Sequence, residues 1–128
     1  MQKTFLISGS FLAALAVVLG AFGAHALKAK LEPDQLQVFE TGVKYQMYHA
    51  IALILAGILF EKFSNSYNTY AGYLFIAGTI FFSGSLYLLS CRSILGIEGW
   101  RFLGPITPLG GLCFILAWIM LMVSFIKK

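Results

Sequence analysis

Four long apolar segments alternate with short polar segments along the chain. They cover approximately residues 4–26, 34–60, 70–89 and 109–126. A helix needs about 20 consecutive, mostly apolar residues to cross a membrane, so each segment is long enough for one span. The pattern predicts an all-α fold, an integral membrane four-helix bundle that uses residues 1–128 as a single domain.

The first apolar segment has two interpretations. Lys3, the apolar run and the small residues around His25 imitate a secretory signal with its cleavage site. The run is longer than the about 7–15 apolar residues of such a signal, and three further apolar segments follow it. We therefore favour a retained first helix and expect Met1 to be kept.

Small residues gather on one half of the predicted first helix. At about 100° per residue, that half carries Gly9, Ser10, Ala13, Ala14, Gly20, Ala21, Ala24 and His25, and the other half carries Phe11, Leu15, Val18 and Phe22. Membrane helices pack closely through small residues. We expect the first helix to be central, with its large side chains toward lipid. The predicted packing residues are Gly9, Ala13, Gly20, Gly23 and Ala24.

The predicted second helix carries a polar stripe in its first half. Thr41, Tyr45, Tyr48, His49, Ala52 and Ala56 lie within one narrow sector at helical spacing. A histidine facing lipid would be expensive, so the stripe is expected to face the small residues of the first helix. It is the favoured functional spot of the chain.

The two histidines and their neighbours form the candidate ligand or proton site, which comprises His25, Thr41, Tyr45 and His49. Polar residues inside a membrane are functional candidates by default. The simpler interpretation, which we favour, is a neutral imidazole bonded to a tyrosine, a carbonyl or water. A role for the histidines in binding a small ligand or moving a proton comes second, and a metal or haem ligand comes third.

The last connection, residues 90–109, is rich in glycine, proline and aromatic residues, which suits the headgroup layer. The stretch from Thr107 to Gly111 at its end resembles a helix start, and Thr107, Gly110 and Gly111 form a candidate site where free N–H groups are able to bind a lipid headgroup. The favoured alternative is a cap and turn before the fourth span.

Composition agrees with a membrane protein: 59% of the residues are hydrophobic, 11% are charged, and the mean hydropathy is +0.85. The basic residues are scattered among the segment ends, which favours anchoring at the membrane surface and gives no indication of a nucleic-acid partner. Four basic residues flank one side of the predicted bundle and five flank the other, so the orientation stays open. Cys91 and Cys113 show no metal-binding or redox spacing, and we expect neither a metal nor a cofactor.

Four stretches resemble a known family. They are Gly20-Ala-Phe-Gly-Ala-His-Ala-Leu27, Thr41-Gly-Val-Lys-Tyr-Gln-Met-Tyr-His-Ala50, Phe82-Ser-Gly-Ser-Leu-Tyr87 and Ile106-Thr-Pro-Leu-Gly-Gly-Leu112. In order and over nearly the whole chain, they resemble domain-of-unknown-function family 423, small inner-membrane proteins of bacteria. The resemblance implies a four-helix protein of the bacterial cytoplasmic membrane and supplies no catalytic residue.

Two hypotheses for function follow, with a weaker third. The first is a non-catalytic, multi-pass membrane protein that acts through membrane lipids, through membrane-protein partners or as a homo-oligomer. The alternative is a binder or carrier of a small ligand, lipid or proton at the Tyr45/His49 region. The third, a redox protein linked to haem or quinone, is supported only by the two histidines. No motif predicts an enzyme, because the serines lack a nucleophile elbow and a paired acid.

Overall fold

The computed structural model describes residues 2–127, which contain helices and no strand. The elements are α1 (Gln2–His25), the 3-10 turn η1 (Leu27–Ala29), α2 (Pro33–Leu59), α3 (Ser66–Gly78), the π-helical η2 (Thr79–Ser83), α4 (Gly84–Ser90), α5 (Arg92–Leu95) and α6 (Leu103–Ile126). Because α3, η2 and α4 run on without a break, four segments are long and apolar enough to cross a membrane. The predicted all-α, four-span bundle is confirmed, while the retention of Met1 concerns a residue outside the described range.

The second half of the bundle begins its helices earlier than the apolar pattern indicates. α3 starts at Ser66 because the Asn65 side chain accepts a hydrogen bond from the backbone N–H of Asn68 and so caps the helix. α6 starts at Leu103, several residues before the expected start near 109. Pro105 lies in the first turn, where backbone N–H groups have no intrahelical partner, so the helix tolerates it.

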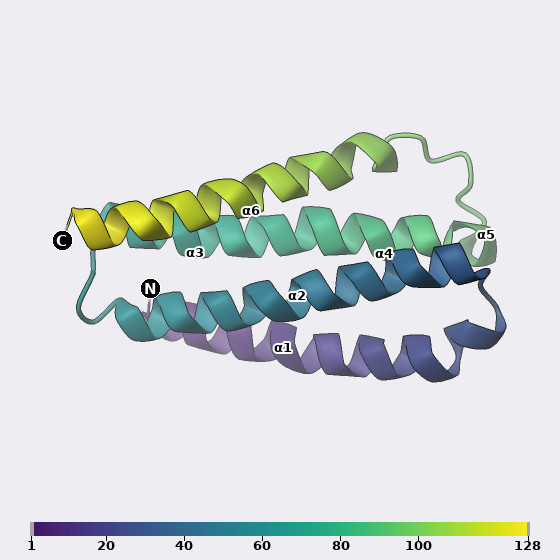
Figure 1. Ribbon diagram of the computed structural model, residues 1–128, viewed down its shortest axis with the longest axis horizontal. Helices are drawn as coiled ribbons and strands as arrows, with labels where there is room; N and C mark the ends of the chain where they lie inside the picture. The colour runs from purple at the N-terminus through teal and green to yellow at the C-terminus, as the bar shows by residue number, and fades with distance from the viewer. Residues whose placement is uncertain (1, 128) are drawn as a thin grey trace.

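The central helix is α2, and the expectation that the first helix is central is wrong. In the most apolar window of each helix, 44% of the α2 residues are buried inside the molecule against 17% for α1. In the view of Figure 1, α2 lies between α1 and the segment formed by α3 and α4, and α6 runs along that segment. The reason is that α2 carries small residues toward both neighbours, Gly57 toward α1 and Gly42 toward α4.

Close packing of α1 on α2 depends on glycines. An added Cβ at Gly9 would lie 2.9 Å from the carbonyl oxygen of Ala50, and one at Gly23 would lie 2.8 Å from the Phe39 ring. Gly20 faces Val43 at an ordinary distance, 3.4 Å.

The buried face of α1 nevertheless differs from the predicted smooth half. It includes Phe5 and Ala16, whereas Ala24 is exposed and Ala13 is half-buried. The face of α1 that carries Phe5 points inward, because the Phe5 ring packs against Gly72 of α3. A side chain at position 72 would occupy the space of that ring. The exposure of Phe11, Val18 and Phe22 agrees with their predicted lipid-facing positions.

Candidate functional site

A cavity of about 600 Å³ lies between α2 and α6, and we call it the aromatic groove. Eight residues line it: Tyr45, Tyr48, His49, Phe82, Gly111, Phe114, Ile115 and Trp118. Three elements supply them, α2, η2 and α6. Five of the eight are Phe, Tyr or Trp, so the walls are mostly aromatic rings.

His49 forms the inner wall of the aromatic groove and uses both of its ring nitrogens. Nδ1 lies 2.7 Å from the backbone oxygen of Tyr45, which can only accept, so Nδ1 carries the proton. Nε2 is then an acceptor, and the indole N–H of Trp118 donates to it over 3.1 Å. The two bonds set one neutral tautomer and tie α2 to α6 across the inner end of the groove.

The imidazole of His49 is also held by packing. Its ring stacks on Phe114 with 3.6 Å between ring centroids and 7° between planes, and the side chain is only 5% exposed. Phe114 lies midway between Arg101 and Lys127, the charged residues that flank the fourth span. The floor of the aromatic groove is therefore close to the middle of the bilayer.

The outer walls of the aromatic groove are more open. The Tyr45 ring packs on Phe82 at 4.8 Å and lies 5.8 Å from the Tyr48 ring. Tyr45 is 39% exposed and Tyr48 is 57% exposed. Two phenol rings near the middle of a membrane are unusual, because tyrosine gathers at the membrane–water interfaces.

The π-helical segment η2 places Phe82 in this wall. Its wider turn interrupts the third span between α3 and α4, and such segments often occur at functional sites. Gly110 of α6 packs on the backbone of Phe82 so closely that an added Cβ would be 2.7 Å from its Cα. One turn earlier on α6, the hydroxyls of Thr107 and Ser85 are 2.6 Å apart. These contacts hold α6 against η2 and the start of α4 beside the groove.

The structure separates the four residues of the predicted ligand or proton site. Tyr45 and His49 line the aromatic groove together. Thr41 instead bonds back to the carbonyl of Gln37 on its own helix. His25 is exposed at the end of α1. Because Gly9 lies beside Ala50, His25 is more than about 20 Å along α1 from the level of His49, and the two histidines do not meet.

The predicted orientation of the polar stripe is also wrong, because Tyr45 and His49 face α6 and not α1. The helix face turned toward α1 carries Gln46, whose amide donates to the backbone oxygen of Leu12 over 2.8 Å. The hydroxyl of Tyr87 on α4 donates to the other end of that amide over 2.6 Å. Gln46 thus joins three spans, and its partners satisfy it.

The candidate headgroup site does not open a helix. Thr107, Gly110 and Gly111 lie inside α6, which begins at Leu103. Gly110 is a packing contact, Thr107 is a hydrogen-bonding contact, and Gly111 lines the aromatic groove. The idea that free N–H groups of these residues bind a headgroup is therefore wrong.

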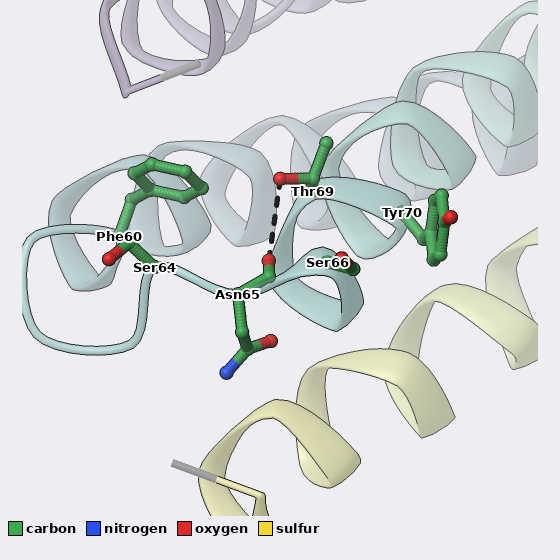
Figure 2. Close-up of a pocket in the computed structure, with 6 residues that line it drawn as sticks. All are labelled: Phe60, Ser64, Asn65, Ser66, Thr69 and Tyr70. Atoms are coloured by element: carbon green, nitrogen blue, oxygen red, sulfur yellow. Dashed lines mark hydrogen bonds between the residues drawn. The ribbon is translucent and has the colours of Figure 1, made fainter.

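A second, smaller cavity of about 400 Å³ lies at the turn between α2 and α3. Figure 2 shows its lining residues: Phe60, Ser64, Asn65, Ser66, Thr69 and Tyr70. Asn65 points from this turn toward α6, where its amide donates to the Ser124 carbonyl over 3.0 Å. Thr69 bonds to the Asn65 carbonyl. These polar groups serve to close the turn.

Sequence reasoning missed the α6 and η2 halves of the site, which are Phe82, Phe114, Ile115 and Trp118. One signal was available: Trp118 lies deep inside an apolar span, although tryptophan normally marks the interfaces. Gln46 was also missed, although a lone amide within a span requires partners. In residues 2–127, no three His, Cys, Asp or Glu side chains gather where they could hold a metal ion.

The fold and the aromatic groove define a class: a small multi-pass membrane protein with a membrane-embedded, aromatic-walled groove. The family described as "Protein of unknown function (DUF423)" matches residues 19–111, and the chain belongs to this family. It is 49% identical to the UPF0382 membrane protein YwdK of Bacillus subtilis (strain 168), over 98% of both chains. It is 45% identical to a UPF0382 membrane protein of Staphylococcus haemolyticus, also over 98% of both chains.

These relatives and the four apolar spans place the protein in the cell membrane. No solved structure matches the chain.

Proposed function

We propose that the protein is a non-catalytic membrane protein that binds a lipid-like molecule in the aromatic groove. The observation that carries the proposal is the groove itself, a cavity of about 600 Å³ walled by rings and open between α2 and α6. Ligand pockets typically measure about 300–1,000 Å³ and are lined mainly by apolar and aromatic side chains with a few polar groups. The aromatic groove fits that description.

The state of His49 supports binding and argues against chemistry at the imidazole. A general base, a proton carrier or a metal ligand needs a ring nitrogen with an available lone pair. In His49 the Nδ1–H group donates a hydrogen bond to the backbone oxygen of Tyr45, and the Nε2 lone pair accepts one from the indole N–H of Trp118. The imidazole thus acts as a strut that holds the groove open at its inner end.

The position of the groove supports a membrane lipid as the source of the ligand. The floor lies at mid-bilayer depth, and the exposed walls include Tyr48, Ile115 and Trp118. A molecule dissolved in the membrane reaches this site laterally, without crossing a polar layer. The structure of the groove therefore suits an occupant that already resides in the bilayer.

The test is to fill the groove and measure co-purifying lipid. Ile115→Trp places a large ring in the groove, whereas Ile119→Trp places the same ring one turn later on α6, outside the groove lining. Native mass spectrometry after purification in mild detergent should show a bound lipid on the wild type and on Ile119→Trp, and its loss from Ile115→Trp. Equal lipid retention by both variants would mean that the groove is not the binding site.

A further inference from the structure

The polar atoms of the aromatic groove indicate which kind of lipid it takes. Four lining residues carry polar side-chain atoms, namely Tyr45, Tyr48, His49 and Trp118, and the other four are Phe82, Gly111, Phe114 and Ile115. His49 and Trp118 bond to each other, which leaves the two phenol hydroxyls. In the described part of the chain, neither phenol oxygen has a hydrogen-bond partner on another residue, in contrast to Tyr87, which donates to Gln46. Both hydroxyls are therefore available to an occupant.

These hydroxyls lie deep in the membrane, where a hydroxyl without a hydrogen-bond partner costs free energy. Tyr48 is one helical rise, about 1.5 Å, from His49, and His49 stacks on Phe114 in the middle of the fourth span. A hydroxyl without a partner in an apolar environment costs about 2–7 kcal/mol. Water does not reach the hydrocarbon core to supply that partner, so an oxygen-bearing ligand is the natural one.

The arrangement of the aromatic rings in the walls further limits the class of lipid that fits the groove. The rings of Tyr45, Phe82 and Phe114 lie within 6.5 Å of one another by their centroids. Aromatic surfaces at such spacings favour offset stacking with another planar ring. A phospholipid does not offer this combination, because its ester oxygens lie near the bilayer surface and only its acyl chains reach the middle.

We infer that the aromatic groove binds a ring-bearing lipid of the prenylated-quinone type, which combines a planar ring, acceptor oxygens and an apolar tail, with Tyr48 and Tyr45 as hydrogen-bond donors. This inference rests on the proposed function and names the ligand class of the same site. It concerns binding only and includes no electron transfer.

The experiment compares two probes with matched tails, a benzoquinone that carries a decyl chain and decylbenzene. Equilibrium partitioning into nanodiscs that contain the protein, corrected for empty nanodiscs, gives the affinity of each probe. The quinone should bind at least tenfold more tightly than decylbenzene. Tyr48→Phe should weaken quinone binding by about twofold to tenfold, the loss of one hydrogen bond, and should leave decylbenzene binding unchanged. Tyr70→Phe, an exposed tyrosine of α3 outside the groove, is the matched control and should change neither affinity.

The outcomes separate the two proposals. Saturable binding of both probes with equal affinity, unaffected by Tyr48→Phe, would overturn the quinone-type assignment and leave a groove for plain hydrocarbon chains. Absence of saturable binding of either probe would overturn the proposed function itself. Unfolding temperatures of the two tyrosine variants, measured in the same nanodiscs, confirm that any change in affinity comes from a folded protein.

Discussion

The two sides of α2 contact their neighbouring helices through different kinds of residue. Toward α1, glycines bring the backbones together, and the Gln46 amide reaches the carbonyl of Leu12 directly. Toward α6, the contact is made by long aromatic side chains, with Phe114 on His49 and Trp118 bonded to it. On the first side, the cavity beside Gly20 and Val43 measures about 210 Å³. On the second side, rings hold two helices apart over a groove of about 600 Å³.

This difference indicates which side is structural and which is able to bind. In a membrane, lipid tails are as apolar as the helices, so close packing of small residues is a main source of helix association. The α1 side of α2 follows that rule. The α6 side gives up close packing, keeps a polar strut and exposes rings, which favours its use for a ligand.

The largest expected effect on stability comes from adding one methyl group to a glycine on the α1 side of α2, and the same change in the groove is the control. Gly9→Ala should destabilise the protein by about 1–3 kcal/mol, because the new Cβ would lie 2.6 Å from the Ile54 side chain and 2.9 Å from the Ala50 oxygen. Gly111→Ala, in the groove, meets only the Phe82 ring at 3.8 Å and should be neutral. Thermal unfolding in detergent measures both, and equal unfolding temperatures for the two variants would contradict the contrast.

A second effect tests the polar contact on the closed side. Gln46→Leu should lower the unfolding free energy by about 1–3 kcal/mol, because the Tyr87 hydroxyl loses its acceptor in an apolar environment. Tyr87→Phe in the same chain removes that hydroxyl, so the double variant should recover part of the loss. A double variant that loses the full sum of the two single effects would show that the two side chains are not coupled.

A smaller effect is expected from the strut on the open side. His49→Phe keeps a ring for stacking on Phe114 but removes both hydrogen bonds of the imidazole. The cost should be about 1 kcal/mol, because the ring that stacks on Phe114 is kept and only the hydrogen bonds of the imidazole are lost. Thermal unfolding gives the cost, and a loss as large as that of Gly9→Ala would mean that His49 belongs to the closed core.

The smallest effect is a gain in stability, and it concerns a buried side-chain amide that makes no hydrogen bond. Asn68 is fully buried, and neither amide atom of its side chain has a hydrogen-bond partner within residues 2–127. Asn68→Leu should therefore raise the unfolding free energy by up to about 1 kcal/mol. Marked destabilisation by this change, of the kind expected for Gln46→Leu, would show that the amide does have a partner.

Much of the fold follows from the sequence alone. Apolar segments of spanning length predict four membrane helices, and the bulky residues Phe11 and Val18 do face outward. The rotation of α2 does not follow, because its polar residues occupy two faces. Gln46 finds its partners on α1 and α4, and His49 finds Trp118, which is remote in sequence. Periodicity identifies polar positions but does not tell which neighbour satisfies them.

The groove could not be predicted from the sequence either, because η2 interrupts the regular helical register. A uniform helix through Thr79–Ser83 would give Phe82 a different direction from the one that the π-turn sets. The starts of α3 and α6 depend on a cap at Asn65 and on a tolerated Pro105, which hydropathy does not detect. The site therefore depends on local exceptions to the regular pattern.

The central claim, that the aromatic groove holds a lipid-like molecule, is tested most directly by photolabelling in the membrane. A lipid with a photoreactive diazirine in the middle of its chain is activated in vesicles that contain the protein, and the labelled residues are mapped by mass spectrometry. Ile115 in the groove is 58% exposed and Phe11 on the outer face of α1 is 64% exposed, so random collision with lipid should label them equally. We predict that labelling concentrates on Tyr48, Ile115 and Trp118 and falls when unlabelled membrane lipid extract is added. Equal labelling of Ile115 and Phe11, insensitive to that competitor, would contradict the claim.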